Sequence, residues 1–196
     1  MSVHDFFSGS RVYLEGLSNY LDNLDTSIRI SEARSLTGRE QALLFAHAAG
    51  FRPLALEDFV PQSLSSLHQV IHHGRNSLPV FTIFEKRFCR PDKEGPRDVL
   101  WGYNEQPLKT ITGPGYFVAR QASELEVVID YRETPPRKPK DWPTILPNSA
   151  RLSRFIYYQT QDYVRGVSKH VSIGRASRHG RPMDNWFVLC RDDSRG

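Results

Sequence analysis

The sequence is poor in cysteine. Its 196 residues include only two, Cys89 and Cys190, and these lie far apart in the chain. They form neither a CxxC pair nor a Cys/His cluster with the spacing of zinc ligands. A disulfide framework is therefore excluded. We expect two buried thiols, no bound metal and no cofactor.

Long apolar runs are also missing. No stretch approaches the roughly 20 apolar residues that span a bilayer, and the start, MSVHDFFSGSRVYLEGL, lacks the basic region and apolar run of a signal peptide. We therefore expect a cytoplasmic protein. Hydrophobic residues make up 39% of the chain and charged residues 24%, which indicates a globular protein and not a disordered one.

Motifs of common catalytic and cofactor sites are absent as well. Gly113, Pro114 and Gly115 run into a predicted strand, whereas phosphate-binding glycine loops lead into a helix. The chain has no GxSxG and no HExxH motif. His68 and His72 have the spacing of a metal-binding pair on one helix face, but no third ligand lies near them in sequence. No motif therefore names a reaction.

The first part of the chain shows helical periodicity, which predicts a mainly helical region over residues 1–96. In the clearest element, Thr37 and Glu40 have capping-box spacing, and Gly50 and Pro53 mark its end. Residues 79–90 fit either a helix or a strand, since VFTIF is β-branched and aromatic. The three segments with apolar residues at spacings of three and four are 11–24, 36–53 and 62–74.

Alternating patterns follow after residue 96 and predict an antiparallel sheet over 97–196. Leu125, Val127, Ile129 and Tyr131 share one strand face. A proline-rich loop leads from this strand to a long helix, predicted over 150–167 from its apolar face. The predicted strands are 98–103, 108–112, 115–120, 124–132, 169–176 and 184–191.

This order, ββββ-α-ββ, predicts one compact α+β domain. It would have a helical N-terminal third and a curved antiparallel sheet of about six strands, with the long helix packed on or in the sheet. The net charge of +4 is unevenly spread, because residues 132–181 hold 11 Lys or Arg against three Asp or Glu. Such a basic segment favours an anionic ligand, an acidic partner or nucleic acid.

Candidate site residues come mainly from this second half. The face with His170, Ser172 and Gly174 is small and polar, which fits either a packed surface or the floor of a pocket. His170, Asp130 and Tyr131 are the candidate catalytic residues, as acid or base and orienting partners. The candidate ligand-binding residues are Arg154, Tyr158, Tyr163, Ser172 and Arg175.

Three functions fit these residues. The first is a soluble binding module with a pocket for a small anionic or amphiphilic ligand between sheet and helix. The second is a cofactor-independent isomerase, cyclase or hydrolase, which requires that the catalytic candidates converge around one cavity. The third is nucleic-acid binding through the basic segment and its aromatic residues, although no known nucleic-acid motif matches. The sequence favours the binding module.

Overall fold

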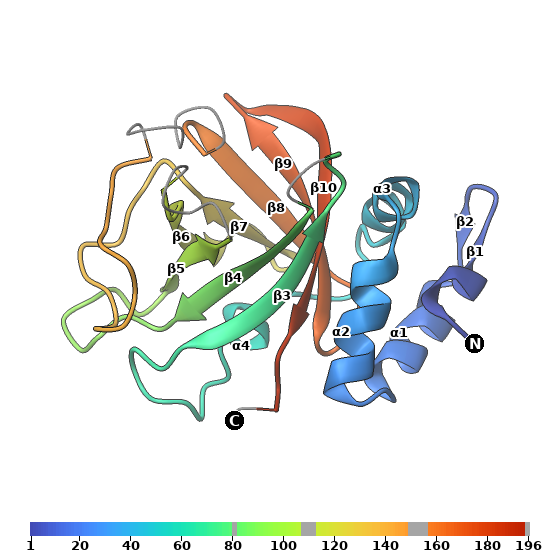
Figure 1. The fold of residues 1–196 in the computed structure, drawn as a ribbon, viewed down its shortest axis with the longest axis horizontal. Coiled ribbons are helices and arrows are strands. Elements are labelled where there is room, and N and C mark those ends of the chain that lie inside the picture. The colour runs from blue at the N-terminus through green and yellow to red at the C-terminus, as the bar shows by residue number, and fades with distance from the viewer. Residues whose placement is uncertain (80–81, 107–112, 149–156, 195–196) are drawn as a thin grey trace.

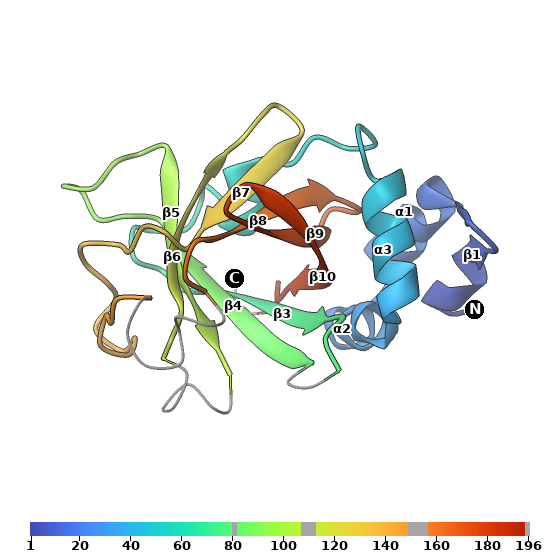
Figure 2. The same cartoon turned by 90° about the horizontal axis from the view of Figure 1, so that it is seen from above.

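A closed antiparallel β-barrel forms the main body of the protein, and helices cover one of its sides (Figures 1 and 2). The computed structural model describes residues 1–79, 82–106, 113–148 and 157–194. Within these residues the barrel has eight strands, in the order β10-β3-β4-β5-β6-β7-β8-β9. The strands are β3 (Val70–Asn76), β4 (Ile83–Cys89), β5 (Val99–Glu105), β6 (Tyr116–Gln121), β7 (Glu126–Asp130), β8 (Thr160–Gly166), β9 (Val171–Arg178) and β10 (Arg181–Arg191).

The predicted fold class is therefore wrong. A closed barrel replaces the open six-stranded sheet, because β10 at the end of the chain pairs with β3, which was expected to be a helix. The ambiguous segment 79–90 forms strand β4 over its residues 83–89. The long helix predicted over 150–167 is wrong at Thr160–Gly166, which form β8. Its first part, 150–156, lies outside the described residues.

Four short α-helices replace the expected helical third. The segment begins with a 3₁₀ turn at Val3–Phe6 and a two-stranded ribbon, β1 (Phe7–Ser8) and β2 (Arg11–Val12). The capping box of α3 is confirmed, because the Glu40 amide donates to Thr37 Oγ1 at 3.3 Å and the Thr37 amide to Glu40 Oε2 at 2.8 Å. The helices are α1 (Leu14–Asp22), α2 (Thr26–Ser35), α3 (Gly38–His47) and α4 (Leu56–Phe59).

The helices occupy two places. Helices α2 and α3 pack on the outer face of the barrel at β3, β9 and β10, with α1 beyond them (Figure 2). Helix α4 lies across one end of the barrel (Figure 1). No helix in the described parts of the chain has the length and apolar character needed to cross a bilayer.

Apolar side chains form three separate layers. One fills the barrel interior, a second lies between the barrel and helices α1 to α3, and a third lies under the proline-rich loop, where Trp142 is buried. Strand β10 illustrates the alternation, since Phe187 and Leu189 face the interior while Val188 and Cys190 face the helices. The two cysteines lie in different outer layers, so the prediction of no disulfide is confirmed.

Glycines opposite phenylalanines shape the interior. Three cross-strand pairs place a ring directly on a glycine, so that the backbone itself forms the ring's contact surface. A Cβ atom on Gly174 would lie 2.1 Å from the ring of Phe187, and one on Gly102 would lie 2.3 Å from that of Phe117. No side chain larger than hydrogen fits there. The three pairs are Gly74–Phe84, Gly102–Phe117 and Gly174–Phe187.

Candidate functional site

A lysine inside the barrel is the centre of the first candidate site. Strand β4 alternates so that Phe84, Lys86 and Phe88 face the interior, which buries the Lys86 ammonium among apolar side chains. All three of its N–H donors have partners. Lys86 Nζ donates to Asn104 Oδ1 at 3.0 Å, to Asp162 Oδ2 at 3.1 Å and to the Tyr131 hydroxyl.

The partners of Lys86 come from three other strands or their ends. Asn104 lies on β5 directly opposite Lys86, Asp162 lies on β8, and Tyr131 follows β7. The Asn104 amide group also donates to the Tyr131 hydroxyl and to the Gly115 carbonyl, both at 3.1 Å. One charged pair and two neutral groups therefore form a connected network, which is the condition for burying a charge at acceptable cost.

Aromatic rings surround the same ammonium. Nζ lies 4.9 Å from the ring centroid of Tyr131, 5.0 Å from Phe187, 5.4 Å from Phe117 and 5.5 Å from Phe84. These distances are within the range of cation–π attraction. The three phenylalanines are those held against glycines, so the backbone positions the rings around the charge.

Burial changes the acid–base properties of this group. Desolvation lowers the pKa of Lys86, and the Asp162 carboxylate opposes that shift. Burial, with a further contribution from the Asp162 charge, raises the pKa of Tyr131 well above its usual value. The site therefore holds an amine that is easier to deprotonate than in water and a phenol that keeps its proton.

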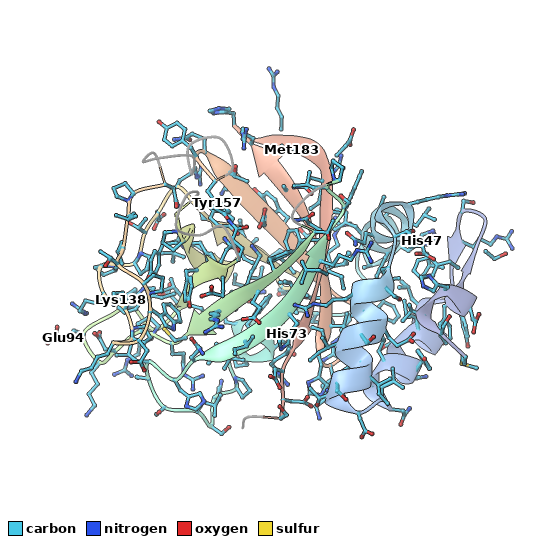
Figure 3. The ribbon with its side chains drawn as sticks, viewed as in Figure 1. His47, His73, Glu94, Lys138, Tyr157 and Met183 are labelled. Atoms are coloured by element: carbon cyan, nitrogen blue, oxygen red, sulfur yellow. The ribbon has the colours of Figure 1, made fainter. Side chains whose placement is uncertain are left out.

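Tyr157 covers the Tyr131 side of the cluster. Its ring stacks on Tyr131 with centroids 5.1 Å apart, and its hydroxyl accepts a hydrogen bond from Gln106 Nε2 at 2.9 Å. Figure 3 places Tyr157 toward the end of the barrel away from α4.

The opposite end of the barrel is closed by α4, whose last carbonyls are held by inward-facing side chains. Arg191 Nη1 donates to the Asp58 carbonyl at 2.7 Å, and Arg90 Nη1 to the Val60 carbonyl at 2.9 Å. His72 Nε2 donates to the carbonyl of Phe59 at 3.0 Å. Donors at a helix C-terminus satisfy its free carbonyls, so these side chains fix α4 on the barrel.

Arg191 is the unusual member of this group. Its other terminal nitrogen donates to His170 Nδ1 at 3.0 Å. Because a guanidinium only donates, Nδ1 must accept and the His170 proton lies on Nε2, which faces the Asp193 carboxylate at 3.4 Å. Burial, together with the Arg29 charge, lowers the pKa of His170 to about 4, so the ring is neutral at pH 7. Among the described residues Arg191 has no carboxylate within ion-pair distance, although it is buried.

A cavity of about 180 Å³ lies beside Arg191, where β3 begins and β10 ends. Pro61, Leu64, Val70 and Ile71 supply its apolar wall. Its polar lining comes from Ser63, His68, Gln69, Arg191, Asp192 and Asp193. Burial lowers the pKa of Arg191 from its usual value, because a charged guanidinium is disfavoured away from water.

The sequence-derived catalytic candidates lie in different places. His170 lies beside Arg191 at the α4 end, while Tyr131 lies in the Lys86 cluster. Asp130 faces outward, where Arg132 Nη2 donates to its carboxylate at 2.6 Å and Gln161 Nε2 at 3.0 Å. These three residues do not converge around one cavity. An enzyme that uses them together would require such convergence.

The ligand-binding candidates are also dispersed. Ser172 faces the interior and, with His170, lines a void of about 10 Å³ next to the Arg191 site. Tyr158 and Tyr163 are exposed. Arg175 lies outside, with its guanidinium 5.2 Å from the ring of Trp186. Arg154 lies outside the described residues.

Sequence reasoning missed Lys86, Asp162 and Arg191. For Lys86 a signal existed, since Phe84, Lys86 and Phe88 alternate with Glu85 and Arg87 in a way typical of a strand with one buried lysine. Asp162 and Arg191 become visible only when the strand pairings are known, because nothing local indicates that these charges face inward.

The fold and these sites define a closed β-barrel, a class that often encloses ligands and is compatible with a binding module. Among the described residues, charged side chains inside it gather at two places, around Lys86 and around Arg191. No family model, no curated protein and no solved structure matches this chain.

Proposed function

We propose that the protein binds a small organic anion, a carboxylate with an apolar body, in the cavity beside Arg191. The observation that carries this proposal is a buried guanidinium whose hydrogen-bond partners among the described residues are neutral, on a residue that lines a cavity of about 180 Å³. A buried charge is costly unless it is paired. A ligand carboxylate supplies the missing counter-charge and accepts directed N–H bonds from the guanidinium.

The acidic residues at the cavity do not fill this role, because they are engaged elsewhere. Asp193 accepts from Arg29 Nη2 at 2.5 Å and faces His170. Asp192 faces His73 Nε2 at 3.5 Å and accepts from the Ser194 hydroxyl at 2.6 Å. The charges of Asp193 and Asp58 oppose the lowering of the Arg191 pKa, but among the described residues neither carboxylate lies within ion-pair distance of the guanidinium.

The size and lining of the cavity indicate the rest of the ligand. A cavity of about 150 Å³ accommodates a benzene ring, and the wall formed by Leu64, Val70 and Ile71 suits an apolar body of that size. A ligand such as benzoate would place its ring on this wall and its charge at Arg191. Ser63 and Gln69 line the same cavity and offer further polar contacts.

Calorimetric titration with benzoate tests the proposal, with hexanoate as an aliphatic probe and benzamide as the uncharged match. We expect both carboxylates to bind and benzamide to bind at least tenfold more weakly, because only the charged group compensates the guanidinium. Trp142 gives an optical signal, since its indole N–H donates to Gln69 Oε1 at 2.8 Å in the cavity wall.

Arg191→Met removes the charge and keeps an apolar side chain of similar length, and it should abolish carboxylate binding. Arg181→Met, at the exposed start of β10, makes the same change in net charge and should leave binding intact. Circular dichroism verifies that each variant is folded. Equal affinity for benzamide and benzoate, or unchanged binding by a folded Arg191→Met variant, would refute the proposal.

A further inference from the structure

We propose a second chemistry inside the barrel, in which the Lys86 amine captures a small aldehyde or ketone as an imine. The geometry that points to it is an amine in direct contact with a carboxylate and a phenol, and enclosed by aromatic rings. This site shares no residue with the Arg191 cavity, so the inference is independent of anion binding.

The step balances with the groups present. The Lys86 ammonium transfers a proton to Asp162, which leaves a neutral amine and a carboxylic acid. The amine nitrogen adds to the carbonyl carbon of the ligand, and one of its protons passes to the carbonyl oxygen, which gives a neutral carbinolamine. The Asp162 proton then goes to the carbinolamine oxygen, which leaves as water and gives the iminium ion with Asp162 ionised again. Amine nucleophiles in proteins are activated by desolvation in this manner.

The surroundings favour the product as well as the amine. An iminium ion carries the same positive charge at the same nitrogen, so the rings of Phe117, Phe187 and Tyr131 and the Asp162 carboxylate stabilise it as they stabilise the ammonium. Stability alone gives a weak reason for such a cluster. A buried ion pair often contributes no more to folding than well-packed apolar residues in its place.

Three residues of the cluster keep a small exposed fraction. Phe84 is 9% exposed, Tyr157 8% and Asp162 5%, whereas the interior residues Phe88 and Ile129 are 0% exposed. Lys86 itself is 3% exposed, so a ligand reaches the amine only when side chains around it move. A carbonyl compound of two or three carbons would enter beside Tyr157, where the smaller side chain of a Tyr157→Ala variant widens the path.

Reductive trapping tests the inference. The protein is incubated with propionaldehyde and sodium cyanoborohydride at pH 6.5, and the alkylation rate of each lysine is followed by peptide mass mapping. The exposed Lys93 serves as the internal reference. We expect Lys86 to be alkylated at least tenfold faster than Lys93, and faster again in Tyr157→Ala.

Two variants separate this chemistry from simple accessibility. Asp162→Asn keeps hydrogen-bonding atoms but removes the proton acceptor, and it should slow alkylation of Lys86 at least tenfold without changing that of Lys93. Lys86→Met should lose the adduct and keep benzoate binding. Alkylation of Lys86 only after unfolding in urea, a rate no greater than that of Lys93, or an unchanged rate in a folded Asp162→Asn variant would each overturn the inference.

Discussion

The stability of the barrel should depend on pH through a histidine that the fold keeps neutral. His72 lies inside the barrel between Phe59 and Phe88, with ring centroids 5.2 and 4.9 Å away. Its Nε2–H is bonded to the Phe59 carbonyl, and its Nδ1, the atom that would accept a proton, is buried without a partner in the described residues. Burial lowers the pKa of His72 to about 3.

The sign of the effect follows from proton uptake. In the unfolded chain a histidine has a pKa near 6.5, so below that pH the unfolded state takes up a proton that the folded state refuses. The contribution of the neutral histidine to the free energy of unfolding is therefore fully present above about pH 6.5. It is lost progressively as the pH falls toward the folded-state pKa. Between pH 7 and pH 5 the loss is about 2 kcal/mol for His72, because each pKa unit corresponds to about 1.4 kcal/mol. His170, with its pKa lowered to about 4, adds a similar amount.

Urea unfolding at pH 7, 6 and 5 measures this dependence. We expect the unfolding free energy to fall by about 4 kcal/mol in the unmodified protein. His72→Gln keeps a donor for the Phe59 carbonyl but does not titrate, so the fall should be about half as large. His179→Gln, in the exposed β9–β10 turn, should leave it unchanged. A constant unfolding free energy over this range, or a full-size fall in His72→Gln, would show that His72 is not held neutral by burial.

Two further substitutions test the packing and the helix start. Gly102→Ala places a methyl group 2.3 Å from the ring of Phe117 and 2.6 Å from the Arg87 carbonyl oxygen. We expect it to lower the free energy of unfolding, measured in urea, by about 3 kcal/mol. A loss below about 1 kcal/mol would mean that the ring moves freely. Thr37→Ala removes the side-chain acceptor of the Glu40 amide. It should lower the thermal unfolding midpoint by an amount equivalent to about 1 kcal/mol of stability. An unchanged midpoint would mean that solvent satisfies that amide equally well.

Local signals predicted local structure correctly. The capping box of Thr37 and Glu40 identified α3, and the hairpin turn at His179 and Gly180 joins β9 and β10 as expected. The alternation that placed Val127 and Ile129 on one strand face is also confirmed, and both residues are buried in the barrel interior. Each of these depends on residues only a few positions apart.

Closure of the barrel was beyond local signals. It requires that Phe187 on β10 lie opposite Asn76 on β3, a pairing between distant parts of the chain. The three glycine–phenylalanine pairs are equally hidden, because a glycine in a strand says nothing about which ring will cover it. The positions of Arg191 and Lys86 in the candidate sites follow from these pairings.

The two strands mistaken for helices are also strands that contribute polar groups to the interior, and the errors have a physical cause. Strand β3 faces inward with Val70, His72 and Gly74, and β8 with Thr160 and Asp162 before Val164. A strand is recognised by apolar residues at every second position, so a polar inward residue removes the signal. Sequences depart from such local rules chiefly where function demands it. His72 adjoins the Arg191 site and Asp162 is part of the Lys86 site, so both departures coincide with the proposed sites.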